Sequence, residues 1–115
     1  MKGMMVFTLL LTFTVTALAQ TETTAPFFEM QQLYEGRRFP SVVTAMDGTV
    51  LAFRADRGTA PIQVRRSEDG GATWSEVIQV GEDPVHLGAA IVDEQSGDIM
   101  VFDSGNTMYR STDNG

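Results

Sequence analysis

The chain has 115 residues, no cysteine and a formal net charge of −7. The absence of cysteine excludes disulfide bonds and a lipoprotein-type anchor, and an acidic exterior repels phosphate backbones and anionic lipid headgroups. We therefore expect no nucleic-acid partner and no binding to a membrane surface.

The first 19 residues have the composition of a secretory signal peptide. Lys2 gives a positive start, residues 4–15 are almost all apolar or threonine, and Ala17, Leu18 and Ala19 form the small-x-small pattern that signal peptidase accepts. The alternative of a retained anchor is disfavoured because a membrane-spanning helix needs roughly 20 apolar residues. Cleavage after Ala19 predicts a secreted or periplasmic protein without stable membrane insertion, and removes the single lysine, which leaves a net charge of −8.

The rest of the chain is predicted to be all-β. Residues 20–36 are polar and unpatterned and predict a leader into the first strand. Beyond them, short runs rich in β-branched and apolar residues alternate with turn residues and show no helical period. These runs are residues 42–43, 50–53, 62–64, 77–80, 90–92 and 99–102.

These runs belong to an internal repeat. Residues 43–53 align with residues 92–102 at an offset of 49, and residues 65–71 align with residues 109–115 at an offset of 44. A repeat of this length with four short strands is typical of a β-propeller blade. We expect blade one at about residues 37–82 and an incomplete blade two at about residues 86–115. Two such blades cannot close a ring, so we expect the isolated chain to be unstable or to aggregate.

Residues 67–74 fit the pattern Ser-x-Asp-x-Gly-x-Thr-Trp. Ser67 and Asp69 can accept bonds from turn amides, Gly71 can adopt a conformation that is costly for other residues, and Thr73 precedes Trp74, which packs on the sheet. The pattern resembles the Asp box of sialidases and related propellers. We interpret it as a structural brace in preference to a metal or catalytic site.

The same motif begins again at Ser111, Asp113 and Gly115, and the sequence stops before the aromatic end of the motif. We therefore expect the chain to be the N-terminal part of a longer propeller of the sialidase type.

A second resemblance covers Arg38, Phe39 and Pro40, then Gly-Thr-Val-Leu-Ala-Phe at residues 48–53, then Arg57. This order is similar to the opening blade of sialidases. The resemblance implies that Arg38 is the first of three arginines that bind the carboxylate of sialic acid, and that Arg57 supports the rim of the pocket. A planar guanidinium can bond both carboxylate oxygens at once. The alternative is that Arg38 is a solvated charge at the end of a strand.

The catalytic residues of the family are only partly represented. The family's general acid/base is an Asp in the loop after the second arginine, and residues 58–61 contain none, so the nearest candidate is Asp56, which is otherwise a surface charge or an ion-pair partner of Arg57. Neither Tyr34 nor Tyr109 matches the position of the family's tyrosine nucleophile, and Tyr109 is expected to pack in the sheet.

The resemblance implies an exported exo-α-sialidase-like glycoside hydrolase that acts on sialylated glycans or other acidic carbohydrates, with no cofactor. His86 is the only histidine and the chain has no cysteine, so no metal site is expected. One alternative is a non-catalytic Asp-box propeller that binds glycans or proteins. Another is a propeller that acts on uronic-acid polymers.

Overall fold

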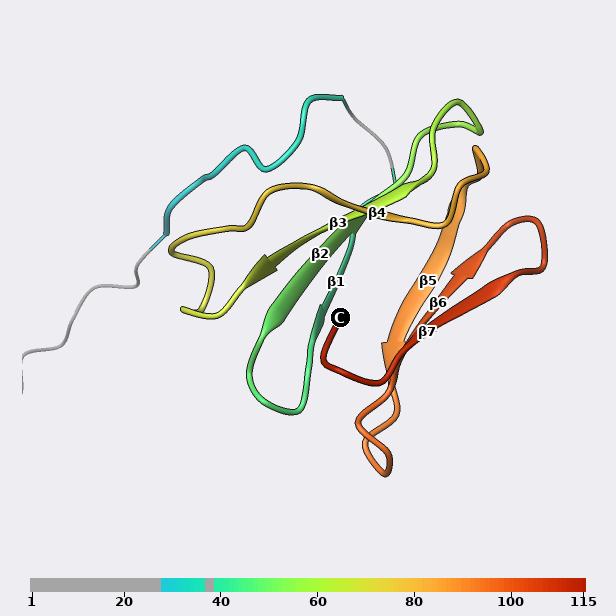
Figure 1. The fold of residues 1–115 in the computed structure, drawn as a ribbon. Helices are drawn as coiled ribbons and strands as arrows, with labels where there is room; N and C mark the ends of the chain where they lie inside the picture. The colour runs from blue at the N-terminus through green and yellow to red at the C-terminus, as the bar shows by residue number, and fades with distance from the viewer. Residues whose placement is uncertain (1–27, 37–38) are drawn as a thin grey trace, which may run out of the picture. The chain divides into compact units, whose positions relative to one another are not determined.

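The computed structural model describes residues 28–36 and 39–115. These residues contain seven strands in two antiparallel sheets and no helix (Figure 1), so the prediction of an all-β chain is confirmed. Residues 31–115 form one compact unit. No helix among the described residues is long and apolar enough to cross a membrane. The predicted signal peptide and Arg38 lie outside the described residues.

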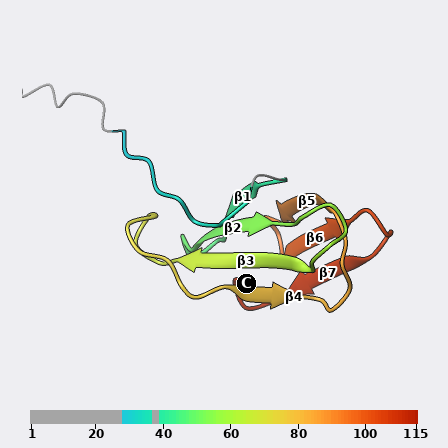
Figure 2. The same cartoon turned by 90° about the horizontal axis from the view of Figure 1, so that it is seen from above.

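Each sheet is a meander in which every strand pairs with the next strand along the chain (Figure 2). The first sheet contains β1 (Ser41–Thr44), β2 (Val50–Arg54), β3 (Ile62–Ser67) and β4 (Ile78–Val80). The second contains β5 (Leu87–Val92), β6 (Ile99–Asp103) and β7 (Met108–Ser111). The six runs expected from the sequence correspond to β1 to β6, and β7 falls in the segment that only the repeat alignment indicated.

The internal repeat extends to the hydrogen-bonding register. Offsets of 49 and 44 convert four of the five pairs between β2 and β3 into the four pairs between β6 and β7. The corresponding pairs are Val50↔Ser67 and Ile99↔Ser111, Leu51↔Arg66 and Met100↔Arg110, Ala52↔Arg65 and Val101↔Tyr109, Phe53↔Val64 and Phe102↔Met108.

The alignment of the first strand in each unit is wrong by one residue. Thr44 pairs with Val50 across five intervening residues, whereas Val92 pairs with Ile99 across six. The extra residue in the second hairpin changes the offset to 48, so Val92 corresponds to Thr44 and not to Val43. A shift of one residue matters because it moves a side chain to the opposite face of the sheet.

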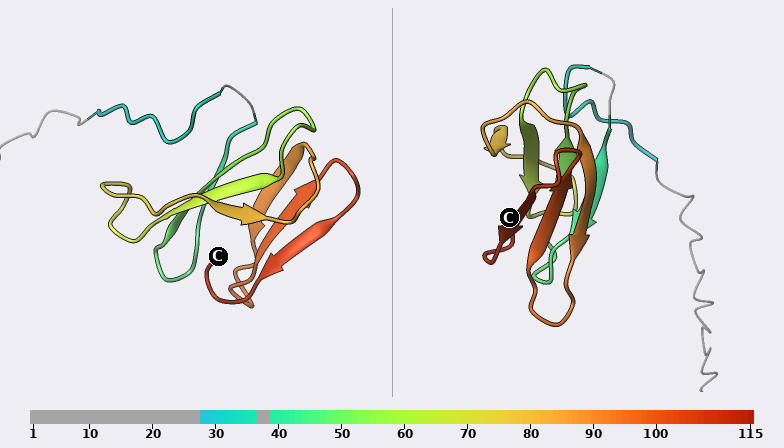
Figure 3. Two further views of the ribbon diagram at one scale, coloured as in Figure 1. Left: turned by 45° about the horizontal axis from the view of Figure 1, so that its top comes forward. Right: turned by 90° about the vertical axis from the view of Figure 1, so that its right-hand side faces the viewer.

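The core lies between the two sheets, which pack face to face (Figure 3). Leu51, Phe53 and Val64 of the first sheet share one buried cluster with Ile99 and Val101 of the second. Of all pairs of strands from different sheets, β1 and β5 approach each other most closely. Alternation along β2 and β6 explains this core, because every second side chain of a strand points to the same face.

The second sheet has an apolar face that points away from the first sheet and is open to solvent. In the repeat, this face corresponds to the side of the first sheet that packs in the core. Phe53 is 4% exposed because the second sheet covers it, whereas Phe102, its counterpart in the repeat, is 38% exposed. Ile91 and Met108 share this face and are 45% and 43% exposed. Among the described residues no further sheet lies against it.

Candidate functional site

The antiparallel meander divides the loops between two ends of the sheets. The β2–β3 end contains the residues before β1 and β5, together with the β2–β3 and β6–β7 loops. The β3–β4 end contains the β3–β4 connection and the hairpins that join β1 to β2 and β5 to β6. The motif at residues 67–74 therefore lies at the opposite end from Asp56 and Arg57.

The motif at the β3–β4 end forms a network of short hydrogen bonds. Ser67 Oγ donates to Asp69 Oδ1 and accepts from the amide of Gly71, both at 2.8 Å. Asp69 also accepts from the Thr73 amide at 2.8 Å and from Thr73 Oγ1 at 2.6 Å. The two hydrogen bonds from Thr73 have the largest effect on Asp69 and that from Ser67 the next largest, and together they lower the pKa of Asp69 to about 2. Gly71 has φ of +96°, in the left-handed region that glycine adopts without strain.

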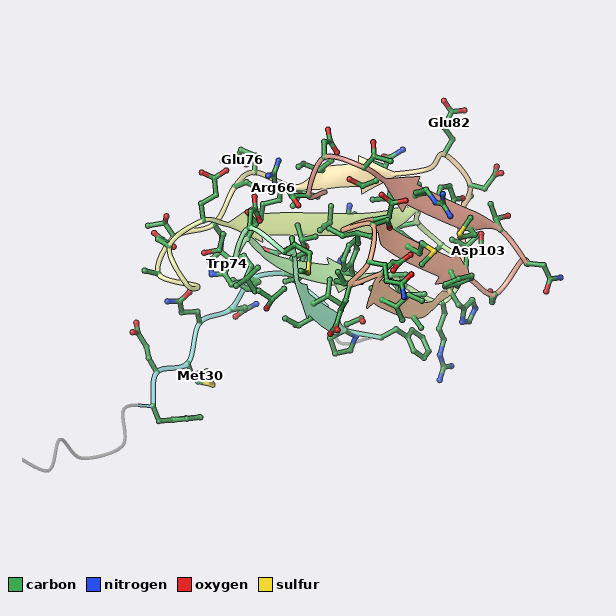
Figure 4. The ribbon with its side chains drawn as sticks, turned by 90° about the horizontal axis from the view of Figure 1, so that it is seen from below. Met30, Arg66, Trp74, Glu76, Glu82 and Asp103 are labelled. Atoms are coloured by element: carbon green, nitrogen blue, oxygen red, sulfur yellow. The ribbon has the colours of Figure 1, made fainter. Side chains whose placement is uncertain are left out.

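Trp74 and the residue after it connect this network to the first sheet and to the segment before β1. Its Nε1 donates to the Gly71 carbonyl and lies at the same distance, 3.0 Å, from Gln31 Oε1. The next residue, Ser75, continues the ladder to Arg66: its amide donates to the Arg66 carbonyl at 2.8 Å, and its hydroxyl accepts from the Arg66 amide at 3.0 Å. Trp74 and Arg66 lie at the same end of the first sheet (Figure 4). The motif thus shapes the hairpin and leaves no group of three His, Cys, Asp or Glu side chains arranged to bind a metal within the described residues.

The second copy of the motif repeats the first pair of bonds. Ser111 Oγ donates to Asp113 Oδ1 at 2.7 Å and accepts from the Gly115 amide at 2.8 Å. Gly115, at φ of +94°, lies against the fully buried Leu51, so that an added Cβ would stand 2.7 Å from a methyl group of Leu51. The brace of the second unit therefore contacts the first sheet directly.

At the β2–β3 end, Asp56 and Arg57 occupy the turn after β2. Asp56 Oδ1 accepts the amide of Arg57 at 2.8 Å, and the Asp56 carbonyl accepts the amide of Gly58 at 2.7 Å. Asp56 is half-buried and Arg57 is exposed. Their side chains do not form an ion pair with each other, so the guanidinium of Arg57 remains available to solvent.

His86 brings the separate parts of this end together. Its ring lies 5.5 Å from that of Phe39, and its Nε2 lies 3.6 Å from the position of a Cβ built on Gly58. Its amide donates to Ser104 Oγ at 3.3 Å, and its carbonyl accepts the Ser104 amide at 3.0 Å. The residues that follow Arg38 and Arg57 thus meet at one imidazole.

These contacts of His86 were not predicted from the sequence, where the residue was considered only as a metal ligand. Its place directly before the first strand of the second unit was the available signal. Tyr109 packs against the core, as expected. The β2–β3 end therefore contains an exposed cation, Arg57, a half-buried carboxylate, Asp56, and the imidazole of His86.

No protein-family model matches the chain, and no solved structure gives a significant match to it. The resemblance to sialidases therefore depends on the sequence motifs alone.

Proposed function

We propose that the two sheets are the first blades of a sialidase-type β-propeller, and that the protein is an exported exo-α-sialidase-like glycoside hydrolase that releases terminal sialic acid from glycans. The observation that carries the proposal is one hairpin brace present twice in the same register. In both copies a serine hydroxyl donates to an aspartate two residues later and accepts the amide of a glycine four residues later.

The open face of the second sheet supports the stacking of further blades. Ile91, Phe102 and Met108 occupy the positions that the second sheet covers in the first unit. Propeller blades need a neighbour on each side, because a single sheet cannot bury both of its faces. A third sheet that packed on this face would repeat the contact between the first two.

In this proposal the substrate binds at the β2–β3 end. Sialic acid carries a carboxylate next to its anomeric carbon, and Arg38 and Arg57 would bind this carboxylate through paired N–H donors. Fixed positive charge also stabilises the oxocarbenium-like transition state of an acidic sugar, because it offsets the charge of the carboxylate without reorganisation. In this proposal Asp56 protonates the leaving oxygen, and the tyrosine nucleophile comes from a later blade.

A non-catalytic propeller that binds sialylated glycans is the second candidate. It is favoured by the state of Asp56, whose Oδ1 already accepts the amide of Arg57, and by the absence of any other Asp in residues 58–61. A binding protein needs the arginines and does not need an acid. The two candidates differ only in the chemistry at the glycosidic bond.

The test is hydrolysis of a fluorogenic aryl sialoside and of a sialylated oligosaccharide by the complete protein. We expect release from both, and a loss of binding in Arg57→Ala and Arg38→Ala but not in Arg110→Ala, which removes an exposed cation from β7. Asp56→Asn should lower kcat about 10²-fold or more on the oligosaccharide and less on the aryl sialoside, whose leaving group needs less protonation. Binding without release would establish the second candidate, and unchanged binding in both arginine variants would exclude both.

A further inference from the structure

The first sheet has an outer face that points away from the second sheet. Val42, Ala52, Arg54 and Arg65 lie on this face, because the neighbouring positions along the same strands point into the core. The Tyr34 hydroxyl donates to the Ala52 carbonyl at 2.6 Å, so the Tyr34 side chain covers this part of β2. Val42 is nevertheless 63% exposed, and Tyr34 lines cavities of about 570 Å³ and 390 Å³. Much of the outer face therefore has no cover among the described residues.

The repeat indicates which kind of element packs on such a face. In the second sheet the positions of Val42, Ala52, Arg54 and Arg65 are occupied by Ala90, Val101, Asp103 and Tyr109. Ala90, Val101 and Tyr109 contribute to the core between the sheets, and Asp103 is 9% exposed. This face of the second sheet therefore packs against the first sheet. In a closed ring the outer face of the first sheet would make the corresponding contact with the last blade.

The two faces differ in how their polar positions are satisfied. Asp103, at the position of Arg54, has its partners in its own hairpin, because its Oδ1 accepts two amides of the β6–β7 turn, both at 2.8 Å. Tyr109, at the position of Arg65, contributes an aromatic ring to the core. The second sheet therefore needs no charged partner from the first sheet.

The two arginines of the first sheet are not satisfied in this way. Arg54 Nε donates to Gln63 Oε1 at 2.9 Å, and Arg54 Nη1 donates to the Glu35 carbonyl. Arg65 Nη1 donates to the Ser75 carbonyl at 3.1 Å, and Arg65 Nε is buried without an acceptor. Because a guanidinium has five N–H donors, most donors of both side chains have no acceptor among the described residues.

The charges of Arg54 and Arg65 lie close together and lack a counterion. Their guanidinium carbons lie 5.3 Å and 5.7 Å from the centre of the Tyr34 ring. No carboxylate in the described part of the chain lies within ion-pair distance of either arginine. The face of an aromatic ring attracts a cation but does not neutralise it. A blade that packed here and excluded water would therefore be destabilised unless it paired these charges, since burial of an unpaired charge is unfavourable.

We propose that this outer face is the closing interface of the ring, and that the last blade places an Asp or Glu carboxylate between Arg54 and Arg65. A carboxylate fits because a guanidinium can bind both of its oxygens, and because Asp and Glu are the side chains that are negatively charged at neutral pH. The contact between the first and second sheets has no such pair at the corresponding positions, so the closing contact differs from it in charge. This difference favours closure by the last blade over closure by another sheet. The inference rests on the ring of the proposed function but not on its activity.

The test uses the complete protein with Arg65→Lys and, separately, with Arg54→Lys. A carbodiimide joins an amine to a carboxylate that contacts it, and the natural sequence has no lysine in residues 20–115. We expect each variant to form an intramolecular cross-link to one Asp or Glu of the last blade, identified by mass spectrometry. Arg57→Lys, on the exposed turn after β2, is the matched control and should not link to that residue.

Charge reversal gives a second readout. Arg65→Glu should lower the urea midpoint of the complete protein more than Arg65→Gln, because the new carboxylate would face the proposed one. Replacement of the cross-linked acid by Arg in the Arg65→Glu variant should recover this loss. Equal midpoints for Arg65→Glu and Arg65→Gln would overturn the proposal.

The cross-links also separate this inference from the proposed function. A link to Glu35, a link between two molecules, or no link in either variant would overturn the closing interface. If these links were absent while Phe102 was protected from hydroxyl radicals, the stacked blades would stand and only the closing contact would be wrong. Links to the last blade in a protein that does not hydrolyse sialosides would support the closing interface and refute the activity alone.

Discussion

Gly81 lies in the connection between β4 and β5, where the chain passes from the first sheet to the second. Its φ is +76°, and a Cβ added to it would stand 2.6 Å from the hydroxyl oxygen of Tyr109 and 2.8 Å from two ring carbons. Tyr109 is half-buried and packs against the core. We therefore predict that Gly81→Ala destabilises the protein through two separate effects.

The first effect is conformational: a residue with a side chain in the left-handed region costs about 1–2 kcal/mol. The second is steric. Ordinary contacts begin near 3.4 Å, so the ring carbons must retreat by 0.6 Å or more, and such overpacking costs about 1–3 kcal/mol. Gly48 isolates the first effect, because it has φ of +91° and open space around its Cβ position. Gly81→Ala should therefore lower the free energy of unfolding by about 1–3 kcal/mol more than Gly48→Ala.

Urea unfolding measures this difference, with Trp74 as the probe, since it is the only tryptophan in the chain. In a Tyr109→Ala background the steric effect should disappear, and the two alanine variants should then become equally destabilising. If Gly81→Ala and Gly48→Ala already cost the same in the wild-type background, or if the gap survives removal of the Tyr109 ring, the reasoning from this contact is wrong.

Three further predictions concern the brace, the leader and the open face. The pKa of Asp69 is lowered to about 2, so the stability that its carboxylate contributes is present above its ordinary pKa near 4 and is lost as the pH falls toward 2. The difference in stability between wild type and Asp69→Ala in acid titrations should therefore close over this range, and a difference that does not change with pH would contradict the prediction. Tyr34→Phe removes the hydroxyl bond to β2 and should cost about 0.5–1.5 kcal/mol in urea unfolding. Phe102→Glu should reduce self-association of the 115-residue chain in sedimentation velocity, whereas Val42→Glu, at a more exposed position on the first sheet, should not; association that persists in Phe102→Glu would show that the open face is not its cause.

The strands could be predicted where apolar side chains cluster, and were missed where they do not. β2 and β6 were found directly, because apolar residues fill all but the last position of each strand. β7 contains Tyr109 and Arg110 and has no apolar run, so only the repeat revealed it. The first-strand alignment failed by one residue because the glycines of the two hairpins match while the loop lengths differ.

The contacts at the β2–β3 end and around Tyr34 could not be predicted, because they join positions that are distant in the sequence. His86 meets Phe39 and Gly58 only when the first strand of each sheet is in place. Arg54 and Arg65 become neighbours through the pairing of β2 with β3, and Tyr34 reaches them from a leader that has no pattern of its own. The motif at residues 67–74 could be predicted because the hydrogen bonds among Ser67, Asp69, Gly71 and Thr73 join residues no more than four positions apart.

The contact between Gly115 and Leu51 works as a spacer between adjacent repeats, because a bare backbone rests where any side chain would collide. Both repeats have a glycine at this place, Gly71 or Gly115, and an apolar side chain at the position of Leu51, which is Met100 in the second repeat. A gene segment duplicated in tandem would thus encode, together with its strands, the contact that sets its distance from the repeat before it. Such an architecture can lengthen by copying without a new interface having to evolve.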